Sequence, residues 1–335
     1  MEMIFLEDCC DILDYMRIPI TASERIEGEY PYYGANGVQG YVADYIFDDE
    51  LVLLAEDGGN FGSKDKPIAY RVSGKCWVNN HVHVLKPKVE LNVDYLCYSL
   101  MFYNVADIIN GATRQKLTQA AMRKMLLPKR NMEEQISIAS KLNRVIKIKK
   151  NKKLQLELLD NLIKARFVEM FGEPITNSKK LPTEKMDSRY FLKAGITTLA
   201  DDIHDYTEGE YEIPCFGGNG IRGYVEEKSY EGDYPIIGRQ GALCGNVQYA
   251  SGEFHATEHA VLVTMIKEDN TIWVYYMLKL MNLHRYHTGA AQPGLAVKTL
   301  NTVDVIIADI EFQNQFAAFV TQVDKSKVAR EYIAA

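Results

Sequence analysis

The sequence contains one pattern twice. Gly34–Val42 reads Gly-Ala-Asn-Gly-Val-Gln-Gly-Tyr-Val, and Gly217–Val225, 183 positions later, reads Gly-Gly-Asn-Gly-Ile-Arg-Gly-Tyr-Val. Further pairs follow at offsets of 183, then 178 and finally 180: Gly58 with Gly241, Gly62 with Gly245, His81 with His259, Gly111 with Gly289, Leu117 with Leu295, and Gln135 with Gln315. A period this long is too large for a solenoid and predicts two similar domains in tandem.

Composition sets the class of protein. With 335 residues, 47% hydrophobic and 25% charged, the chain is typical of a globular protein with room for two cores. Its longest apolar runs, such as Ala260–Ile266, are too short to cross a membrane, and Met1 opens into an acidic segment. We therefore expect a cytoplasmic protein without a membrane partner. The six cysteines lack CxxC spacing, which favours buried free thiols.

The charge is unevenly distributed. A net charge of -7 argues against non-specific nucleic-acid binding as the only role of the protein. The segment Arg114–Lys153, however, holds thirteen basic residues and only two acids, Glu133 and Glu134. For its last part, Lys147–Lys153, a solvated helix face is as good an interpretation as a binding surface.

The pattern of residues predicts an α+β fold in four segments. Short β-type runs such as Leu51–Ala55 and His81–Leu85 precede a helical stretch near Tyr95–Ile109. The predicted segments are a first domain (1–128), a long helix (129–172), a second domain (173–308) and a C-terminal helix (309–335).

The central helix has clear ends. Asn131 and Glu134 form a capping-box pattern, and the next helix breaker is Gly172. About forty residues give a rod of roughly 60 Å. One imperfect 3.5-residue seam carries Leu142, Val145, Leu156, Leu159, Ile163 and Met170. This seam predicts an antiparallel coiled coil with the repeat copy that begins near Asp309 and is shorter in this sequence.

Two motifs suggest enzyme chemistry. Residues 218–223 match GxGxxG, but a dinucleotide site needs a helix after this motif, and Tyr224-Val225 reads as a strand. Residues 255–259 match HxxEH, but the zinc motif needs a helix, and Ala260–Val263 reads as a strand. Methyltransferase, Walker A and nucleophile-elbow motifs are missing, so we expect no catalysis and no bound metal. A two-domain nucleotide- or metal-dependent enzyme and a coiled-coil protein-binding adaptor remain the alternatives.

The repeat preserves its glycines and changes the residues between them. Gln39 faces Arg222 in the alignment, and Asn60 faces Leu243. Arg, Asn, Gln and His can read base edges, while Lys and Arg hold phosphates. The candidate DNA-binding residues are Asn36, Gln39, Tyr41, Asn60, Lys64, Arg71, Asn79, Asn80, His81, Arg114, Lys116, Asn219, Arg222, Tyr224, Arg239, Gln240, Asn246, His255, Thr257, His259 and Gln292. For any one of them, simple solvation is the competing interpretation.

The order of these motifs resembles the specificity subunit of type I restriction-modification systems. The resemblance rests on the doubled Gly-x-Asn-Gly-x-x-Gly-Tyr-Val, the glycine pairs, the segments Gly111–Leu117 and Gly289–Leu295, and Pro128 with Glu133-Glu134-Gln135 before the long helix. It implies two target recognition domains, each reading half of a split double-stranded DNA site. It also implies a coiled coil that sets the spacer and docks two methyltransferase subunits. Candidate partner-binding residues are Gln135, Leu142, Leu156, Leu159, Ile163, Gln315 and Phe319.

The same resemblance places the chemistry elsewhere. It implies a non-catalytic chain that binds no cofactor itself. Adenine methylation would use S-adenosylmethionine on the methyltransferase, and DNA cleavage would use ATP and Mg in a restriction subunit.

Overall fold

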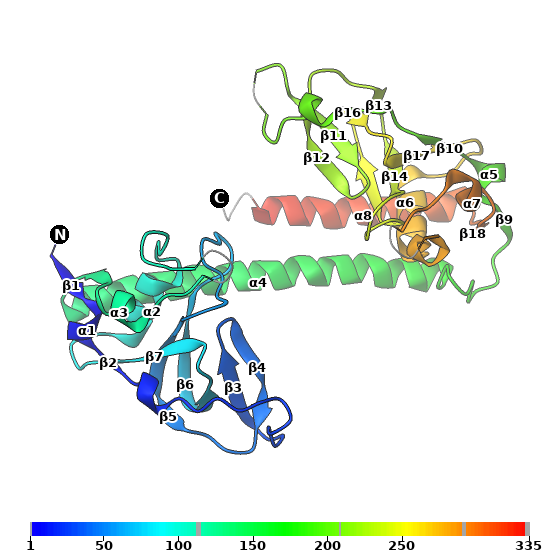
Figure 1. The fold of residues 1–335 in the computed structure, drawn as a ribbon. Coiled ribbons are helices and arrows are strands. Elements are labelled where there is room, and N and C mark those ends of the chain that lie inside the picture. The colour runs from blue at the N-terminus through cyan, green and yellow to red at the C-terminus, as the bar shows by residue number, and fades with distance from the viewer. Residues whose placement is uncertain (1, 112–114, 208, 290–292, 332–335) are drawn as a thin grey trace. The chain divides into compact units, whose positions relative to one another are not determined.

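A computed structural model of the chain describes residues 2–111, 115–207, 209–289 and 293–331, the last four of these without their side chains. The chain divides into two compact units, Met1–Asn151 and Lys152–Ala335, here called unit 1 and unit 2. Each unit contains one copy of the repeat (Figure 1). The helix α4 (Met132–Phe171) begins in unit 1 and ends in unit 2.

Unit 1 is built on a six-stranded sheet with the order β2-β7-β5-β6-β3-β4. Before α4 its elements are β1 (Met3–Phe5), α1 (Leu6–Cys9), β2 (Cys10–Ile12), the 3₁₀ turn η1 (Asp14–Met16), β3 (Tyr30–Gly34), β4 (Gly37–Val42), β5 (Phe47–Ala55), β6 (Ala69–Val78), β7 (Val82–Pro87), α2 (Val93–Met101), α3 (Gln119–Arg123) and β8 (Leu126–Pro128). All neighbours in this sheet are antiparallel except β3 and β6, and β1 pairs separately with β8.

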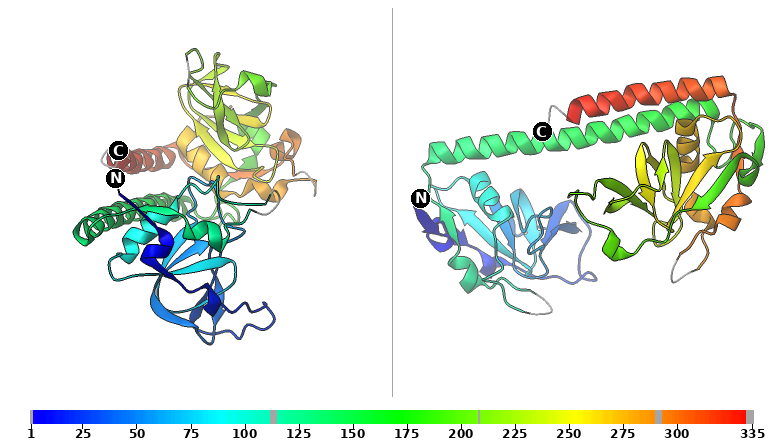
Figure 2. Two further views of the ribbon diagram at one scale, coloured as in Figure 1. Left: turned by 60° about the vertical axis from the view of Figure 1, so that its left-hand side comes forward. Right: turned by 90° about the horizontal axis from the view of Figure 1, so that it is seen from above.

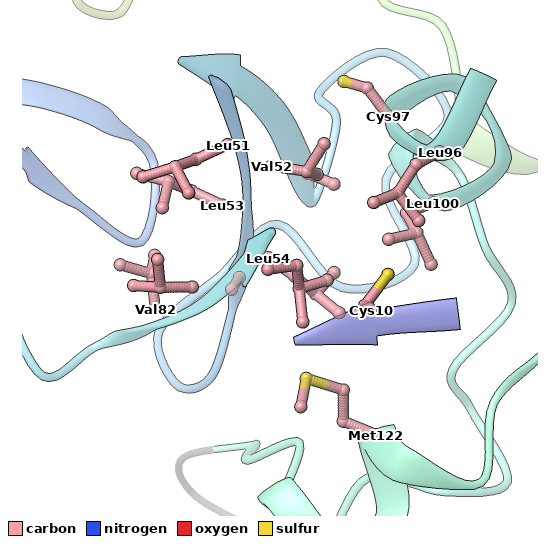
Figure 3. Packing of buried hydrophobic residues seen from close by; sticks show 14 of the residues in the cluster. Cys10, Leu51, Val52, Leu53, Leu54, Val82, Leu96, Cys97, Leu100 and Met122 are labelled. Carbon is pink, nitrogen blue, oxygen red and sulfur yellow. The ribbon is translucent and has the colours of Figure 1, made fainter. Parts of the chain in front are cut away.

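The core of unit 1 lies on both faces of β5. Leu51–Ala55 are fully buried, as expected of a strand that is covered on both sides. Figure 3 shows Val52 and Leu54 facing α2, which contributes Leu96 and Leu100 to the same cluster. The sheet therefore holds α2, and through α2 it positions the start of α4.

Unit 2 repeats the order of elements but divides the sheet. Its elements besides α4 are β9 (Thr183–Lys185), α5 (Met186–Arg189), β10 (Tyr190–Ala194), η2 (Ala200–Asp202), β11 (Ile213–Gly217), β12 (Gly220–Val225), β13 (Tyr230–Glu231), β14 (Tyr234–Gly238), β15 (Val247–Ala250), β16 (Glu253–Ala256), β17 (Ala260–Met265), α6 (Thr271–Leu280), η3 (Leu283–Tyr286), α7 (Val297–Asn301), β18 (Asp304–Ile306) and α8 (Ile310–Glu331). The sheets run β10-β17-β14-β15, β12-β11-β16-β13 and β18-β9.

The sheet of unit 2 is divided where a glycine replaces an aspartate. In unit 1, Asp49 of β5 lies opposite Gly74 of β6, which has φ of 75°, and both strands continue. At the equivalent positions unit 2 has Gly232 and Gly252, which have φ of 119° and 79° and are joined by a backbone hydrogen bond of 2.9 Å. Because both strands change direction at one point, β5 corresponds to β13 and β14, and β6 to β15 and β16.

The long helix agrees with its sequence signals. The Glu134 amide donates to Asn131 Oδ1 at 2.9 Å, and the Asn131 amide donates to Glu134 Oε2 at 3.3 Å, which completes the capping box. At the other end Gly172, with φ of 79°, donates to the Val168 carbonyl.

The helix expected near Tyr95–Ile109 is shorter than predicted. α2 ends at Met101, and the chain continues through turns. Asn104 Oδ1 accepts a hydrogen bond from the Ala106 amide at 3.1 Å. Such a local bond offers the backbone an alternative to the helix, so the prediction was wrong at this end.

A buried glutamine fastens each long helix to its own unit. Gln135 Oε1 accepts from the Asn92 amide at 2.7 Å, where Asn92 caps α2, and its Nε2 donates to the carbonyls of Glu90 and Arg130. In unit 2, Gln313 binds the Asn270 amide and the Ala308 carbonyl in the same way. The pairing of Gln135 with Gln315 was therefore wrong. The true counterpart is Gln313, at an offset of 178, and Gln315 is exposed.

Within unit 2, the end of α4 packs against α8 as an antiparallel pair (Figure 2). Phe316, near the start of α8, meets Phe167 and Phe171 at ring-centroid distances of 5.3 Å and 5.9 Å. Lys327, near the end of α8, forms a 2.7 Å ion pair with Asp160. Of the predicted seam, Ile163 is fully buried, and Leu159 and Met170 pack against the cluster, as does Phe319 of α8.

The remaining expectations concern the cysteines and the membrane. All six cysteines are free and buried. Among the helices of the described residues, none combines the length and apolarity that a membrane span requires.

The assignment of the tether can be tested by Gln313→Ala, with Gln315→Ala as the matched control. Loss of Gln313 leaves buried backbone groups without partners and should lower the free energy of unfolding of unit 2 by about 1–3 kcal/mol. The exposed Gln315 should change it by less than about 0.5 kcal/mol. Urea unfolding followed by Trp273 fluorescence, in a Trp77→Phe background, reports unit 2 alone. Equal effects of the two substitutions would refute the assignment.

Candidate functional site

Three loops of unit 1 meet at Glu56. The Glu56 amide donates to the His81 carbonyl at 2.9 Å, and the Glu56 carbonyl accepts from the Leu117 amide at 2.7 Å. The side chain of Asn36, in the first glycine turn, donates to the Gly58 carbonyl at 3.0 Å. These bonds gather the glycine turn, the glycine-pair loop and the Gly111–Leu117 loop at one end of the unit.

The same backbone bonds occur in unit 2 around Arg239. Its amide donates to the His259 carbonyl at 3.0 Å, and its carbonyl accepts from the Leu295 amide at 2.8 Å. The glycine turn is joined through Asn219, whose Oδ1 accepts from Asn246 Nδ2 at 2.6 Å. We call the loops around Glu56 and those around Arg239 the loop clusters of units 1 and 2.

The repeated glycines serve this arrangement. Gly37 and Gly220 have φ of 106° and 104°, a region that L residues with side chains rarely adopt. In unit 2 a further glycine is required at Gly238, whose counterpart in unit 1 is Ala55, because a Cβ there would lie 1.7 Å from the Gly218 carbonyl oxygen. The glycines thus determine the shape of the clusters and leave the other positions free to vary.

The central side chain differs in sign between the two clusters. Glu56 forms ion pairs with Arg17 at 2.6 Å and with Lys116 at 3.0 Å. Burial disfavours ionisation of Glu56, but these hydrogen bonds outweigh it and lower the pKa of its carboxyl. Because Lys116 is held by Glu56, the third loop of unit 1 is fixed by charge as well as by its backbone.

A buried histidine extends this network. His83 Nδ1 lies 2.7 Å from Asp14 Oδ2, and His83 Nε2 lies 2.9 Å from the Leu117 carbonyl oxygen. Burial opposes ionisation of Asp14, but hydrogen bonds from His83, Gln119 and the Val84 amide outweigh it, so the pKa of this carboxyl is lowered. Unit 2 has Val261 at the position of His83, and the network belongs to unit 1 alone.

The ligand-type atoms of Asp14, Glu56 and His83 lie within 4.8 Å of one another, as a metal site would require. Both ring nitrogens of His83, however, already lie within hydrogen-bond distance of an oxygen atom, so neither is left free to bind a metal ion. Arg17 and Lys116 already neutralise Glu56. The geometry therefore favours an ionic cluster over a metal centre.

The cluster of unit 2 is less completely paired. Arg239 Nε, Thr257 Oγ1 and His259 Nδ1 are buried atoms without a hydrogen-bond partner among the described residues. The equivalent positions of unit 1 hold Glu56, which is paired as above, and Asn79, whose Nδ2 donates to Gln39 Oε1 at 3.3 Å. Unsatisfied buried polar atoms are costly, and they mark places where a ligand or water completes a structure.

The two enzyme motifs lack the required context. Residues 218–223 lie in the hairpin of β11 and β12, so no helix follows the glycines. His255 lies on β16, and Glu258 and His259 lie in the turn before β17. His255 Nε2 contacts Thr198 Oγ1 at 2.8 Å, and partial burial lowers the pKa of the ring. In the described part of the chain these residues do not form a metal-ligand group.

The predicted DNA-binding residues divide into groups. Exposed on or beside the loop clusters are Asn36, Gln39, Tyr41, Lys64, Asn80, Lys116, Asn219, Arg222 and Gln240. Asn60, His81, Tyr224, Arg239, Asn246, His255 and His259 are half-buried, and Asn79 and Thr257 are buried. Arg71 pairs with Glu50 and with Asp94, at 2.7 Å for the second. Arg114 and Gln292 lie outside the described residues.

The predicted partner-binding residues also differ in burial. Gln135 is buried and fully used within unit 1, whereas Leu142 is 39% exposed and Leu156 is half-buried. Sequence reasoning missed Phe167 and Phe171, which form the contact with α8, and missed Asp14, Arg17 and His83. The histidine could have been noticed because its repeat partner is Val261.

Comparisons with known proteins also divide the chain into two segments. The model of the type I restriction modification DNA specificity domain matches residues 1–158 and 192–331. The chain is 49% identical over 133 residues to the type I restriction enzyme EcoprrI specificity subunit of Escherichia coli, which is 40% of this chain and 33% of that protein. It is 39% identical over 123 residues to a putative type I restriction enzyme specificity subunit of Haemophilus influenzae, which is 37% of this chain and 31% of that protein. The alignments thus span about a third of each curated relative.

Solved structures share the fold at low sequence identity. The S subunit of a type I restriction-modification system from M. genitalium has a TM-score of 0.69 at 16% identity, covering 99% of this chain and 91% of that one. A chain from a study of the assembly and conformational transition of a type I system has a TM-score of 0.50 at 13% identity, covering 99% and 92%. From the match to the family model over most of its length, the chain belongs to the family of type I restriction-modification DNA specificity domains.

Proposed function

We propose that this chain is the sequence-specific DNA recognition subunit of a type I restriction-modification complex, and that each unit reads one half of a bipartite site. The observation that carries this proposal is the pair of loop clusters. They share their backbone bonds and their glycines, but Glu56 in one corresponds to Arg239 in the other. A common scaffold with different side chains is what two readers of different sequences require.

The chemistry of the clusters suits this role. Exposed Lys64 and Lys116 could contact phosphates and set the register on DNA. Gln39 and Asn80 in unit 1, and Arg222 and Gln240 in unit 2, carry groups that can read base edges in the major groove. The unpaired atoms of Arg239 and His259 add hydrogen-bonding capacity in unit 2.

The helices are proposed to set the spacer and to dock methyltransferase subunits. α4 leaves large apolar side chains exposed, including Val145 (60%), Ile148 (54%) and Leu158 (57%). Several large apolar side chains exposed on one helix are typical of interaction surfaces. Catalysis would then reside in the partners: adenine methylation with S-adenosylmethionine, and DNA cleavage with ATP and Mg in a restriction subunit. This chain would bind no cofactor and would act in the cytoplasm, where bacterial DNA lies.

Recognition by separate halves predicts a local effect of Arg239→Ala. One good contact to a base contributes about 1–3 kcal/mol of discrimination, so the half-site read by unit 2 should relax at one position by about 5- to 150-fold. The half-site read by unit 1 should stay unchanged. Sequencing of methylated adenines in cells that express the chain with its methyltransferase measures both halves. The matched control is Lys193→Ala, at an exposed position on β10. Relaxation of both halves together would contradict separate readers.

A spacer set by α4 predicts the result of inserting four residues between Lys150 and Asn151. One helical turn adds about 5.4 Å, so the preferred spacer should lengthen by about one or two base pairs, since each step along DNA is roughly 3.4 Å. The half-sites should be unchanged, because both loop clusters are intact. The same methylation mapping gives the result, and an altered half-site with the original spacer would contradict the proposal. A four-residue insertion after Ser251, in the turn between β15 and β16, is the control that should leave the spacer unchanged.

A further inference from the structure

Unit 1 contains a cavity that borders its loop cluster. Its volume is about 730 Å³, and its walls are Phe61–Lys64 on one side and Met101–Ala106 on the other, with Gly111 and Gln115 at the edge. Phe61–Lys64 belongs to the glycine-pair loop, and Gly111 and Gln115 belong to the third loop. The cavity is therefore built from the same loops as the proposed DNA-reading surface, and the inference below rests on that proposed function.

The repeat provides an internal comparison, because the equivalent place in unit 2 is closed by residues that the structure describes. Gly245, the counterpart of Gly62, packs so closely on η3 that a Cβ would lie 2.3 Å from the His284 amide nitrogen. His284 Nδ1 also lies 2.8 Å from the Cys244 carbonyl oxygen. At Gly62 an added Cβ would meet no heavy atom within 4 Å. The scaffold can thus be closed here, and in unit 1 it is open.

An insertion accounts for the difference. Nineteen positions separate Gly62 from His81, but fourteen separate Gly245 from His259. The five additional residues lie in the segment that contains Lys64, where the Ser63 hydroxyl accepts from the Lys66 amide at 3.0 Å and orders the turn. The cavity is therefore a specific feature of unit 1 and is ordered by its own hydrogen bonds.

The lining indicates the chemistry of a ligand. Three aromatic residues, Phe61, Phe102 and Tyr103, line the cavity together with Asn104 and Gln115, which carry amide groups. Phe102 is 55% exposed, and the Tyr103 hydroxyl is held by the Leu126 amide at 3.3 Å. Aromatic faces stack on heteroaromatic bases, amides pair with their edges, and the volume lies within the range of small-molecule sites. Lys64 at the wall could neutralise a phosphate.

We propose that this cavity binds a nucleobase, and that the base is one swung out of the DNA held by the loop cluster of unit 1. A base extruded from a duplex loses its stacking, and a pocket with aromatic walls replaces that stacking. DNA is favoured over a free nucleotide because the walls of the cavity are themselves parts of the proposed DNA-reading loops. Unit 2, with its closed counterpart, should read its half-site without such an extrusion.

The experiment uses the full chain in complex with its methyltransferase and DNA carrying the bipartite site found by methylation mapping. 2-Aminopurine is placed in turn at each position in and beside the half-site of unit 1, because its fluorescence rises when it leaves the stack. We expect a severalfold rise at one position that falls by at least half in Phe102→Ala. Any rise at the methylated adenine itself should be independent of Phe102. Phe191→Ala, at a 57% exposed phenylalanine of unit 2, is the matched control and should change nothing.

A second arm separates the two sources of a base. The chain without DNA is titrated with dAMP, dGMP, dCMP and dTMP, and binding is measured by calorimetry for the wild type and for Phe102→Ala. The free chain could bind a nucleotide saturably, with binding weakened tenfold by Phe102→Ala, while DNA gives no 2-aminopurine signal. This result would support a nucleobase site but overturn the proposal that the base comes from DNA. Bipartite DNA binding with neither signal would overturn the nucleobase site and leave the recognition function intact. Loss of bipartite binding by the wild type would refute the proposed function itself.

Discussion

The rest of this structure depends on one buried amide at the start of each long helix. Gln135 joins the α2 cap, the Glu90 carbonyl and the Arg130 carbonyl. In unit 2, Gln313 joins the Asn270 amide that begins α6, the Ala308 carbonyl and Asp269 Oδ1. Leaving these amide and carbonyl groups unpaired inside the protein would cost free energy, so their hydrogen bonds fix the start of each long helix. Each long helix is therefore attached to the sheet that precedes it in the sequence. The attachment of α4 is made through α2, and that of α8 through α6.

In the loop clusters, backbone hydrogen bonds determine the shape of the loops, and the side chains differ between the two units. When the central residue is Glu56, its negative charge is balanced by Arg17 and Lys116. When it is Arg239, the position of Lys116 is occupied by Gly294, which brings no second cation. The charge of the unit 1 cluster is thus balanced by its own residues, and in both clusters the backbone hydrogen bond to His81 or His259 is kept. This separation allows one fold to present two different surfaces.

Small local changes produce the other differences between the units. Gly74 and Gly252 have similar positive φ, so the units differ at the opposite position, where Asp49 lies in a continuous strand of unit 1 and Gly232, with φ of 119°, lies between two strands of unit 2. Five additional residues open a cavity in one unit at a place where the other is closed. In both cases the altered residues lie outside the core, which explains why the two units retain the same order of elements.

The sequence by itself determined the duplication, the ends of α4 and the glycine turns. The duplication is visible in the sequence itself. The ends of α4 and the glycine turns depend on residues a few positions apart, such as Asn131 with Glu134, or on a single glycine with positive φ. Only the tertiary structure decided that Gln313 rather than Gln315 is the tether and that His83 joins Asp14, 69 positions away. The pairing of polar groups inside a core depends on which distant segments meet there, and no local pattern in the chain records that meeting.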